Sequence, residues 1–322
     1  MRRIAVCALT GALCGAALSA AAADAPYPGK AVRMLVGFSP GGASDILARI
    51  VAKKLSEPWK QQVVVDNRPG GGSLIAAELT AKASPDGYTL LCATSSLVVQ
   101  PSMIRKMPFD TVRDLAPITL AVIGPYILSA NPSLEANSLK ELIALAKANP
   151  GKLNYASAGP GSGLHLAGVL FRSMAGVDMV DVPYKGAVGI PDVLAGHIQM
   201  AFSGLPQALP HIKSGRLRAL GVTTPKRSPI APEIPTIAES GVPGYDVSVL
   251  YGFLAPGPTP KPLIARLHAD IVATLQLADV RQTLLNLGLE PVGSKPEEYA
   301  AMIRSEIEKW AQVVKRAGLQ PN

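Results

Sequence analysis

Residues 32–49 read Val32-Arg33-Met34-Leu35-Val36-Gly37-Phe38-Ser39-Pro40-Gly41-Gly42-Ala43-Ser44-Asp45-Ile46-Leu47-Ala48-Arg49. An apolar run ends at a Ser-Pro-Gly-Gly turn, and apolar residues then recur at helical spacing. This order predicts a strand, a tight glycine loop and the start of a helix. Glycines let the backbone approach a ligand closely, and the free N–H groups of a first helical turn favour an anion.

The same pattern returns near the middle of the chain, as Leu153-Asn154-Tyr155-Ala156-Ser157-Ala158-Gly159-Pro160-Gly161-Ser162-Gly163-Leu164-His165-Leu166. Strand and helix patterns alternate throughout the 322 residues, which predicts an α/β fold. We therefore expect two lobes that face each other across one anionic ligand. The strand expected at 247–254 returns to the first lobe, so that lobe comprises 24–125 and 249–322. Residues 126–248 form the inserted second lobe, and two crossings between the lobes make a hinge.

The first 23 residues have the pattern of a secretory signal peptide. Arg2 and Arg3 precede a short apolar run, and Ala21-Ala22-Ala23 forms an A-x-A cleavage site. Cys14 would suit a lipoprotein, but Leu13 stands before it where a small residue is needed. We expect cleavage near Asp24 and a soluble protein in the periplasm.

Charge and cysteine content narrow the class of protein further. The formal net charge is +8, but lysines and arginines are dispersed rather than gathered into a stripe, which argues against nucleic-acid binding. Cys92 is the one cysteine outside the leader, so no intramolecular disulfide is expected. Its place in an apolar run favours a buried structural thiol.

Motifs for catalysis are missing from the sequence. The four histidines lack metal-ligand spacing, and neither a G-x-S-x-G elbow nor an H-E-x-x-H or P-loop motif occurs. The run Gly159-Pro160-Gly161-Ser162-Gly163 resembles a dinucleotide fingerprint only superficially, because its spacing is wrong and a proline interrupts it. We expect no catalytic residue, no metal and no cofactor.

Hydrogen-bond donors at loop ends remain as candidates, each with a structural alternative. Asp45 suits a cap for its own helix or a ligand contact, and Ser162 an N-cap or a ligand donor. His165 suits packing in a first helical turn or a ligand contact. Lys185 is the one cation expected near the site, or a solvated loop lysine. The triple-glycine loop at 70–72 is either a third ligand loop or a tight turn.

The chain resembles the Bug family, the periplasmic solute receptors of tripartite tricarboxylate transporters. The resemblance covers essentially the whole mature chain in order. It rests on Tyr27-Pro28, Phe38 to Asp45, Asn67-Arg68-Pro69-Gly70, Pro85 to Leu91, Asp114 to Ile118, Gly161 to Gly168, Val182-Pro183-Tyr184-Lys185-Gly186 and Leu209 to Gly215.

The resemblance implies a type II periplasmic-binding-protein fold, in which each lobe is a mixed sheet flanked by helices. It implies a small organic carboxylate as ligand, held by loop backbone groups and bridging waters between the lobes. Val169, Val188, Gly189, Gln199 and Ser203 depart from the family pattern. The candidate ligand-binding residues are Phe38, Ser39, Pro40, Gly41, Gly42, Asp45, Thr94, Ser95, Ala158, Gly159, Ser162, His165, Tyr184, Lys185, Gly186 and Ser203.

The sequence therefore predicts a monomeric receptor that captures a carboxylate and delivers it to a tripartite tricarboxylate-type permease. One alternative is a ligand receptor that reports to a sensor kinase. An exported α/β hydrolase is a second alternative, against which the missing nucleophile elbow speaks.

Overall fold

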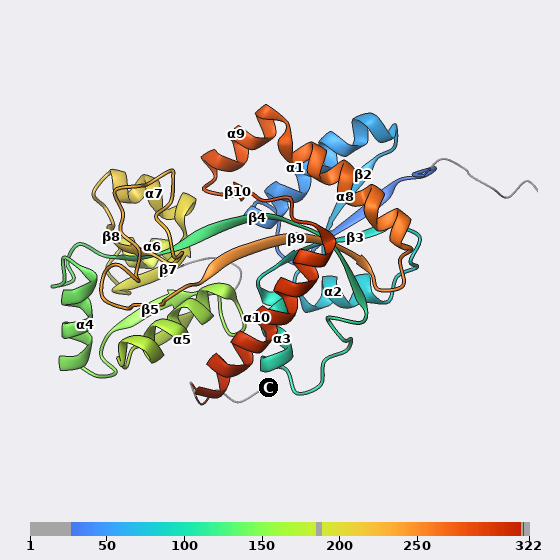
Figure 1. The fold of residues 1–322 in the computed structure, drawn as a ribbon. Coiled ribbons are helices and arrows are strands. Elements are labelled where there is room, and N and C mark those ends of the chain that lie inside the picture. Colours follow the sequence, from blue (N-terminus) through green and yellow to red (C-terminus); the bar gives the residue numbers. More distant parts are fainter. Residues whose placement is uncertain (1–26, 185–188, 317, 319–322) are drawn as a thin grey trace, which may run out of the picture.

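A computed structural model describes residues 27–184, 189–316 and 318, and it confirms a mixed α/β protein (Figure 1). Its strands are β1 (Val32–Val36), β2 (Val63–Asn67), β3 (Thr89–Thr94), β4 (Leu115–Ala130), β5 (Asn154–Ser157), β6 (Val180–Pro183), β7 (Met200–Gly204), β8 (Arg218–Val222), β9 (Ser248–Pro256) and β10 (Glu290–Pro291). Its helices are α1 (Ala43–Trp59), the 3-10 turn η1 (Gly71–Ser73), α2 (Leu74–Ala81), α3 (Ser96–Met103), α4 (Leu139–Ala148), α5 (Gly163–Ala175), α6 (Ile190–Leu194), α7 (Leu205–Lys213), α8 (Lys261–Gln276), α9 (Ala278–Asn286) and α10 (Pro296–Arg316).

These strands form one hydrogen-bonded sheet in the order β2-β1-β3-β9-β4-β7-β5-β6, with β10 and β8 also pairing with β4. Strand β1 runs parallel to both β2 and β3, and Val36 pairs with Asn67 on one side and Cys92 on the other. The loops that follow these three strands therefore leave the same edge of the sheet, which is where ligands bind in open α/β folds.

Strand β4 pairs with different strands along its two parts. Its residues 115–125 pair with β9, and its residues 126–130 pair with β7 and β8. From the sequence alone, the apolar run at 126–130 indicates a strand, whereas the proline-bounded segment 108–117 indicates irregular structure, so the first part of β4 is missed. Pro117 and Pro125 lie within it, and the register with β9 shifts next to Pro117. Proline is rare inside strands except at such irregularities, which hid the strand pattern.

The buried hydroxyl of Thr223 binds the segments that cross between the lobes. It donates to the carbonyl of Val247 at 2.6 Å and accepts from the N–H of Tyr126 at 2.9 Å. Two backbone bonds, from Thr223 N–H to the Tyr126 carbonyl and from Val247 N–H to the Thr223 carbonyl, add to this. Three stretches that are remote in sequence are thus held in register beside the lobe boundary.

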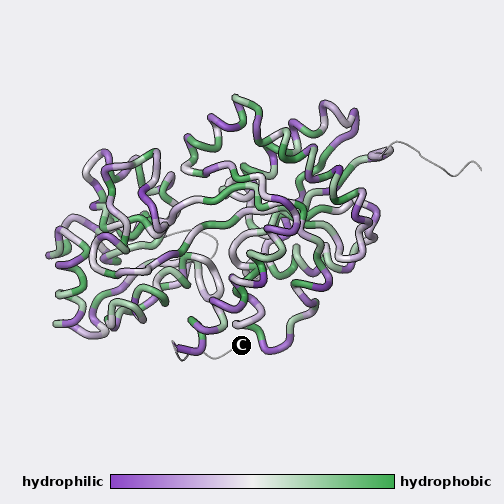
Figure 2. Tube along the Cα trace, in the orientation of Figure 1, coloured by the Kyte–Doolittle hydropathy of each residue, from purple (hydrophilic) through white to green (hydrophobic). Residues whose placement is uncertain are grey.

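Three clusters of buried apolar side chains make up the core. One packs β1, α1 and α8 on one face of the first lobe, and another packs β7 and α7 in the second lobe. The largest cluster is continuous through both lobes and includes Tyr299, Ile303 and Trp310 of α10. Figure 2 shows hydrophobic and hydrophilic residues alternating along helices such as α10, as expected for a helix with one buried face.

Local hydrogen bonds and burial follow directly from the sequence in several places. The Ser138 hydroxyl accepts from the Glu141 N–H at 3.2 Å while the Glu141 carboxylate accepts from the Asn137 N–H, so a capping arrangement starts α4. Cys92 is fully buried. Within 27–184, 189–316 and 318, no helix is both long and apolar enough to cross a membrane.

Candidate functional site

The first glycine loop, residues 38–42, follows β1 and is partly or fully exposed. Gly41 has φ of +87°, a conformation that favours glycine, and Gly42 is the N-cap of α1 with φ of −75° and ψ of 165°. No side chain caps this helix. Within the described part of the chain, the N–H groups of Ala43 and Ser44 have no hydrogen-bond partner. The start of α1 therefore offers free donors to an anion.

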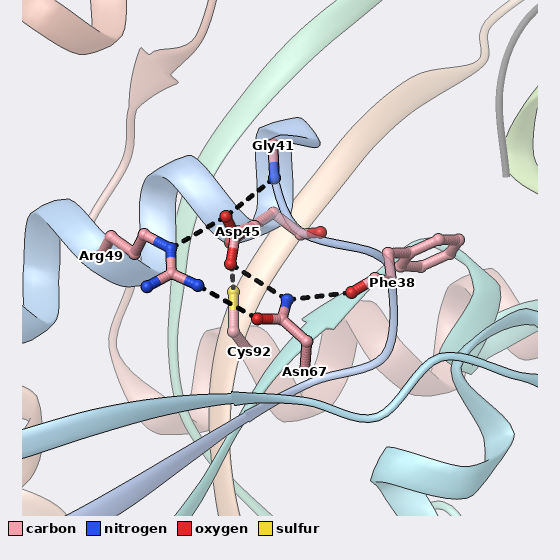
Figure 3. A network of polar contacts seen from close by, with 7 residues as sticks. Phe38, Gly41, Asp45, Arg49, Asn67 and Cys92 are labelled. Carbon is pink, nitrogen blue, oxygen red and sulfur yellow. Dashed lines mark hydrogen bonds and ion pairs between the residues drawn. The ribbon is translucent and has the colours of Figure 1, made fainter.

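Asp45 organises this loop from beneath (Figure 3). Its carboxylate accepts from the Gly41 N–H at 2.9 Å, from Nε of Arg49 at 2.9 Å and from Nδ2 of Asn67 at 3.0 Å. The same amide nitrogen of Asn67 donates to the Phe38 carbonyl at 2.9 Å. The side chain is 3% exposed, and its contacts tie both ends of the loop to α1 and β2.

Burial disfavours the charged form of Asp45, but the hydrogen bonds from Arg49, Gly41 and Asn67 outweigh that effect and hold its pKa below the ordinary value. The carboxylate is consequently ionised and paired. The N–H of Gly41 serves the loop itself, because it already donates to Asp45.

The second glycine loop, residues 158–162, repeats this backbone conformation. Gly161 has φ of +77°, and Ser162 is the N-cap of α5 with φ of −78° and ψ of 154°. Here the N-cap has a side chain, and the Ser162 hydroxyl accepts from the His165 N–H at 3.1 Å. The N–H groups of Gly163 and Leu164 have no partner among the described residues.

The imidazole of His165 lies inside the second lobe. The residue is 8% exposed, and its Nδ1 has no partner in the described part of the molecule. Burial lowers its pKa, the carboxylate of Asp181 opposes that shift, and Arg172 adds to it. This burial is consistent with the packing alternative for His165, and a ligand contact of its side chain stays a prediction.

A chain of contacts joins the two lobes beside these loops. The Ser95 hydroxyl accepts from the Leu250 N–H at 2.9 Å and donates to the Ser248 carbonyl at 3.3 Å. The Ser95 side chain also lies near the phenol of Tyr126, and the Tyr126 hydroxyl lies against Gly163 so closely that a Cβ there would be 2.2 Å from it. The start of α3 in the first lobe and the start of α5 in the second lobe therefore meet at one tyrosine hydroxyl.

Comparison with known proteins supports a binding function for this arrangement. Residues 47–319 match the model of the tripartite tricarboxylate transporter family receptor. The chain belongs to this receptor family. BugT of Bordetella pertussis is 37% identical over 295 residues, covering 91% of this chain and 90% of BugT.

Solved structures agree with the two-lobed periplasmic-binding-protein fold. Rpa4515 of R. palustris, solved with adipate, superposes with a TM-score of 0.84 at 36% identity and covers 92% of this chain and 100% of its own. MatC from Rhodopseudomonas palustris, solved with malate, gives a TM-score of 0.81 at 28% identity, with coverage of 89% and 100%. The family consists of solute-binding receptors rather than enzymes, and membership implies an extracytoplasmic location.

The remaining residues expected in this receptor's site have varied surroundings. Thr94 is partly exposed at the end of β3, and Ala158 is partly and Gly159 fully buried. Tyr184 donates a hydrogen bond to Asp192, which raises the pKa of its phenol to about 12. Lys185 and Gly186 lie outside the described residues, as does the leader.

Ser203 differs most from its expected place at the ligand. It is fully enclosed in β7, opposite Ile127, and its hydroxyl has no partner among the described residues. An alternating strand places its side chain on the same face as Ala201, which belongs to the α6–α7 side of the core. A position at the end of a strand does not by itself show whether the side chain lies on the face of the sheet covered by α6 and α7 or on the opposite face.

Three residues near the receptor's loops were not proposed as site residues from the sequence. Asn67 holds the first loop, and its signal was a polar side chain at the end of a strand parallel to β1. Tyr126 and Gly163 meet across the lobe boundary, and no local pattern in the sequence indicates that contact.

Proposed function

We propose that this receptor binds a small organic carboxylate between its two lobes and delivers it to a tripartite tricarboxylate-type permease. The observation that carries the proposal is the pair of glycine loops with matching backbones, each leaving the first two N–H groups of a helix without a partner. Related proteins solved with adipate and malate support a dicarboxylate as the ligand class.

The proposed ligand contacts follow from these free donors. The N–H groups of Ala43 and Ser44 bind one side of a carboxylate, and those of Gly163 and Leu164 bind it from the other lobe. Phe38, Ser39 and Pro40 line the first loop, and Ala158 and Gly159 line the second. Asp45 is a positioning residue in this scheme, because its charge is already paired and its bonds fix the loop.

The lobe boundaries are proposed from the pairing of β4 and β9. Residues 24–125 and 249–322 then form the first lobe and 126–248 the second, with the Thr223 contacts at the crossing. We propose that the lobes approach each other on binding, because free donors on two lobes reach one small anion only when close together.

Isothermal titration calorimetry with adipate, malate, succinate, glutamate and benzoate tests the function. Ligand at 100 times its Kd adds about 2.7 kcal/mol of stability, so a thermal shift provides a parallel measurement. We expect at least one carboxylate to bind, and adipamide, the neutral diamide, to bind far more weakly. A wild-type protein that binds none of the five acids contradicts the proposal.

The variant Ala43→Pro tests the assigned donors. Proline is favoured at the first helical position, and the extended backbone of Gly42 accommodates it, so the change removes one free N–H without disturbing α1. Loss of a hydrogen bond to a charged group is worth about 1.5–3 kcal/mol, which corresponds to a Kd raised tenfold or more.

Lys261→Pro, at the first position of α8, is the matched control and should leave Kd unchanged. If Ala43→Pro binds as tightly as wild type while a carboxylate does bind, the receptor function stands and the donor assignment is wrong. Whether the partner is a permease is tested separately, by uptake of the identified carboxylate in cells that lack this receptor.

A further inference from the structure

Tyr126 lies close to the second glycine loop but is not among the ligand contacts proposed above. It is the first residue of the part of β4 that pairs with β7, immediately after the part that pairs with β9. Its hydroxyl lies near Ser95, which is the N-cap of α3, and against Gly163, which is the first residue of α5. The side chain thus lies beside the helix start that carries the free donors of the second loop.

The tyrosine is densely surrounded and yet partly exposed to solvent. Burial raises the pKa of its phenol well above the ordinary value, so the hydroxyl is neutral and keeps its proton. Tyr251 is close enough for the two phenols to affect each other electrostatically, and its pKa is raised by burial as well.

The number of protons on the Ser95 and Tyr126 hydroxyls limits the hydrogen bonds that Tyr126 donates. Ser95 accepts one hydrogen bond from Leu250 and has one proton of its own, which lies 3.3 Å oxygen to oxygen from the Ser248 carbonyl, a long distance for such a bond. Because the Ser95 proton is directed at the Ser248 carbonyl, the proton of the Tyr126 hydroxyl remains available to a third group.

We propose that Tyr126 is a ligand-contacting residue, whose hydroxyl donates to the bound carboxylate. This inference rests on the proposed function and names a further residue of the same site. A carboxylate oxygen accepts hydrogen bonds only, so it suits a hydroxyl whose proton is available beside the start of α5. The hydroxyl is a neutral donor supplied from the lobe boundary, and it selects a ligand group that accepts there.

Gly163 is needed for this contact because it has no side chain. A side chain at this position would overlap the tyrosine, since its Cβ would lie 2.2 Å from the hydroxyl oxygen and 3.0 Å from the ring carbon that bears it. The glycine therefore lets α5 approach close enough for its free N–H and the tyrosine proton to reach one carboxylate.

Calorimetry with adipate and malate on Tyr126→Phe tests the proposal. We expect Kd to rise tenfold or more, about 1.4 kcal/mol per tenfold, while the melting temperature of the ligand-free protein changes little. Tyr299→Phe is the matched control, because the Tyr299 hydroxyl also packs against a glycine, Gly252, but within the first lobe. Its Kd should equal that of wild type.

A double-mutant cycle provides a second measurement. Gly163→Ala should lower the melting temperature and weaken binding because of the overlap, and adding Tyr126→Phe should recover part of the melting temperature, since only the ring contacts near 3 Å remain, without restoring affinity. Tyr126→Phe that binds both acids like wild type overturns the inference and leaves the carboxylate function intact. A wild-type protein that binds none of the panel acids overturns both.

Discussion

The two glycine loops share a backbone but are held in different ways. Both have a glycine of positive φ followed by an extended N-cap, at Gly41-Gly42 and at Gly161-Ser162. In the first lobe a buried carboxylate at the third helical position, Asp45, accepts from the loop and recruits Asn67 and Arg49. In the second lobe the N-cap hydroxyl performs the capping, and His165 at the matching position is buried, with no partner for its Nδ1 among the described residues.

This comparison shows that the backbone conformation of the loop and the hydrogen bonds that hold it are independent features. The conformation that leaves the first two helical N–H groups free occurs in both lobes, whereas the bonds beneath it belong to one lobe each. Asp45 adds a negative charge near the start of α1, but Arg49 pairs with that charge at 2.9 Å. The first loop therefore relies on an ionised network and the second on neutral hydrogen bonds.

Removing the support of the first loop should have the largest effect. Asp45→Ala leaves the Gly41 N–H and the Asn67 amide without their acceptor, and we expect the free energy of unfolding to fall by about 2–4 kcal/mol. Ser162→Ala, which removes the support of the second loop, should cost about 1 kcal/mol. Urea denaturation of both variants measures the contrast, and equal losses would show that the two supports are equivalent.

Strain at the two equivalent glycines should be intermediate and equal. Alanine at Gly41 or Gly161 would meet no atom within 4 Å, so only the positive φ opposes it. We expect Gly41→Ala and Gly161→Ala each to destabilise by about 1–2 kcal/mol. Chemical denaturation curves test the equality, and a much larger loss at one site would mean that its loop is constrained by more than its own backbone.

Acidification should affect the two loops in separate pH ranges. Both pKa values are lowered on folding, so the unfolded chain binds more protons and stability falls as pH falls. The contribution of His165 to the free energy of unfolding is fully present above its ordinary pKa of 6.5 and is lost as the pH falls below that value. The contribution of Asp45 is lost only below about 3.8.

Unfolding free energies between pH 3 and pH 8 measure this, with a slope of at most about 1.4 kcal/mol per pH unit for one proton. His165→Gln should flatten the curve between pH 5 and 6.5, and Asp45→Asn should leave that interval unchanged. A curve that both substitutions alter in the same interval would contradict the separation.

Transferring the cap from one loop to the other should have the smallest effect on stability. Gly42→Ser copies the N-cap of α5 onto α1, where a Cβ would meet only the Ser39 carbonyl oxygen at 3.6 Å. We expect a gain of a few tenths of a kcal/mol. The added hydroxyl would bond the N–H of Asp45 and lie beside the free donors, so the Kd for adipate should rise. Calorimetry and thermal melting on the same sample test both expectations.

The sequence predicted those parts of the molecule that depend on neighbours along the chain. The strand–glycine loop–helix pattern located both loops, the N-cap at Ser162 and the buried Cys92, because each follows from local spacing and composition. Family resemblance added the two-lobed fold.

Contacts between remote segments were not predictable in the same way. The meeting of Ser95, Tyr126 and Gly163 depends on how α3, β4 and α5 come together in space, and no spacing encodes it. The enclosure of Ser203 and the burial of His165 depend on which face of an element is covered, which a single position does not determine. The first part of β4 was missed because its prolines obscured a strand that its partner nevertheless stabilises.

The Thr223 hydroxyl has a mechanical consequence for this receptor. It binds Tyr126 on one crossing segment and Val247 on the other, so the two segments are joined at one point. Such a joint resists sliding of one segment along the other but allows both segments to bend and twist. Relative motion of the lobes should then be a rotation about a fixed pivot, which returns the free donors of both loops to the same registration in every cycle of capture and release.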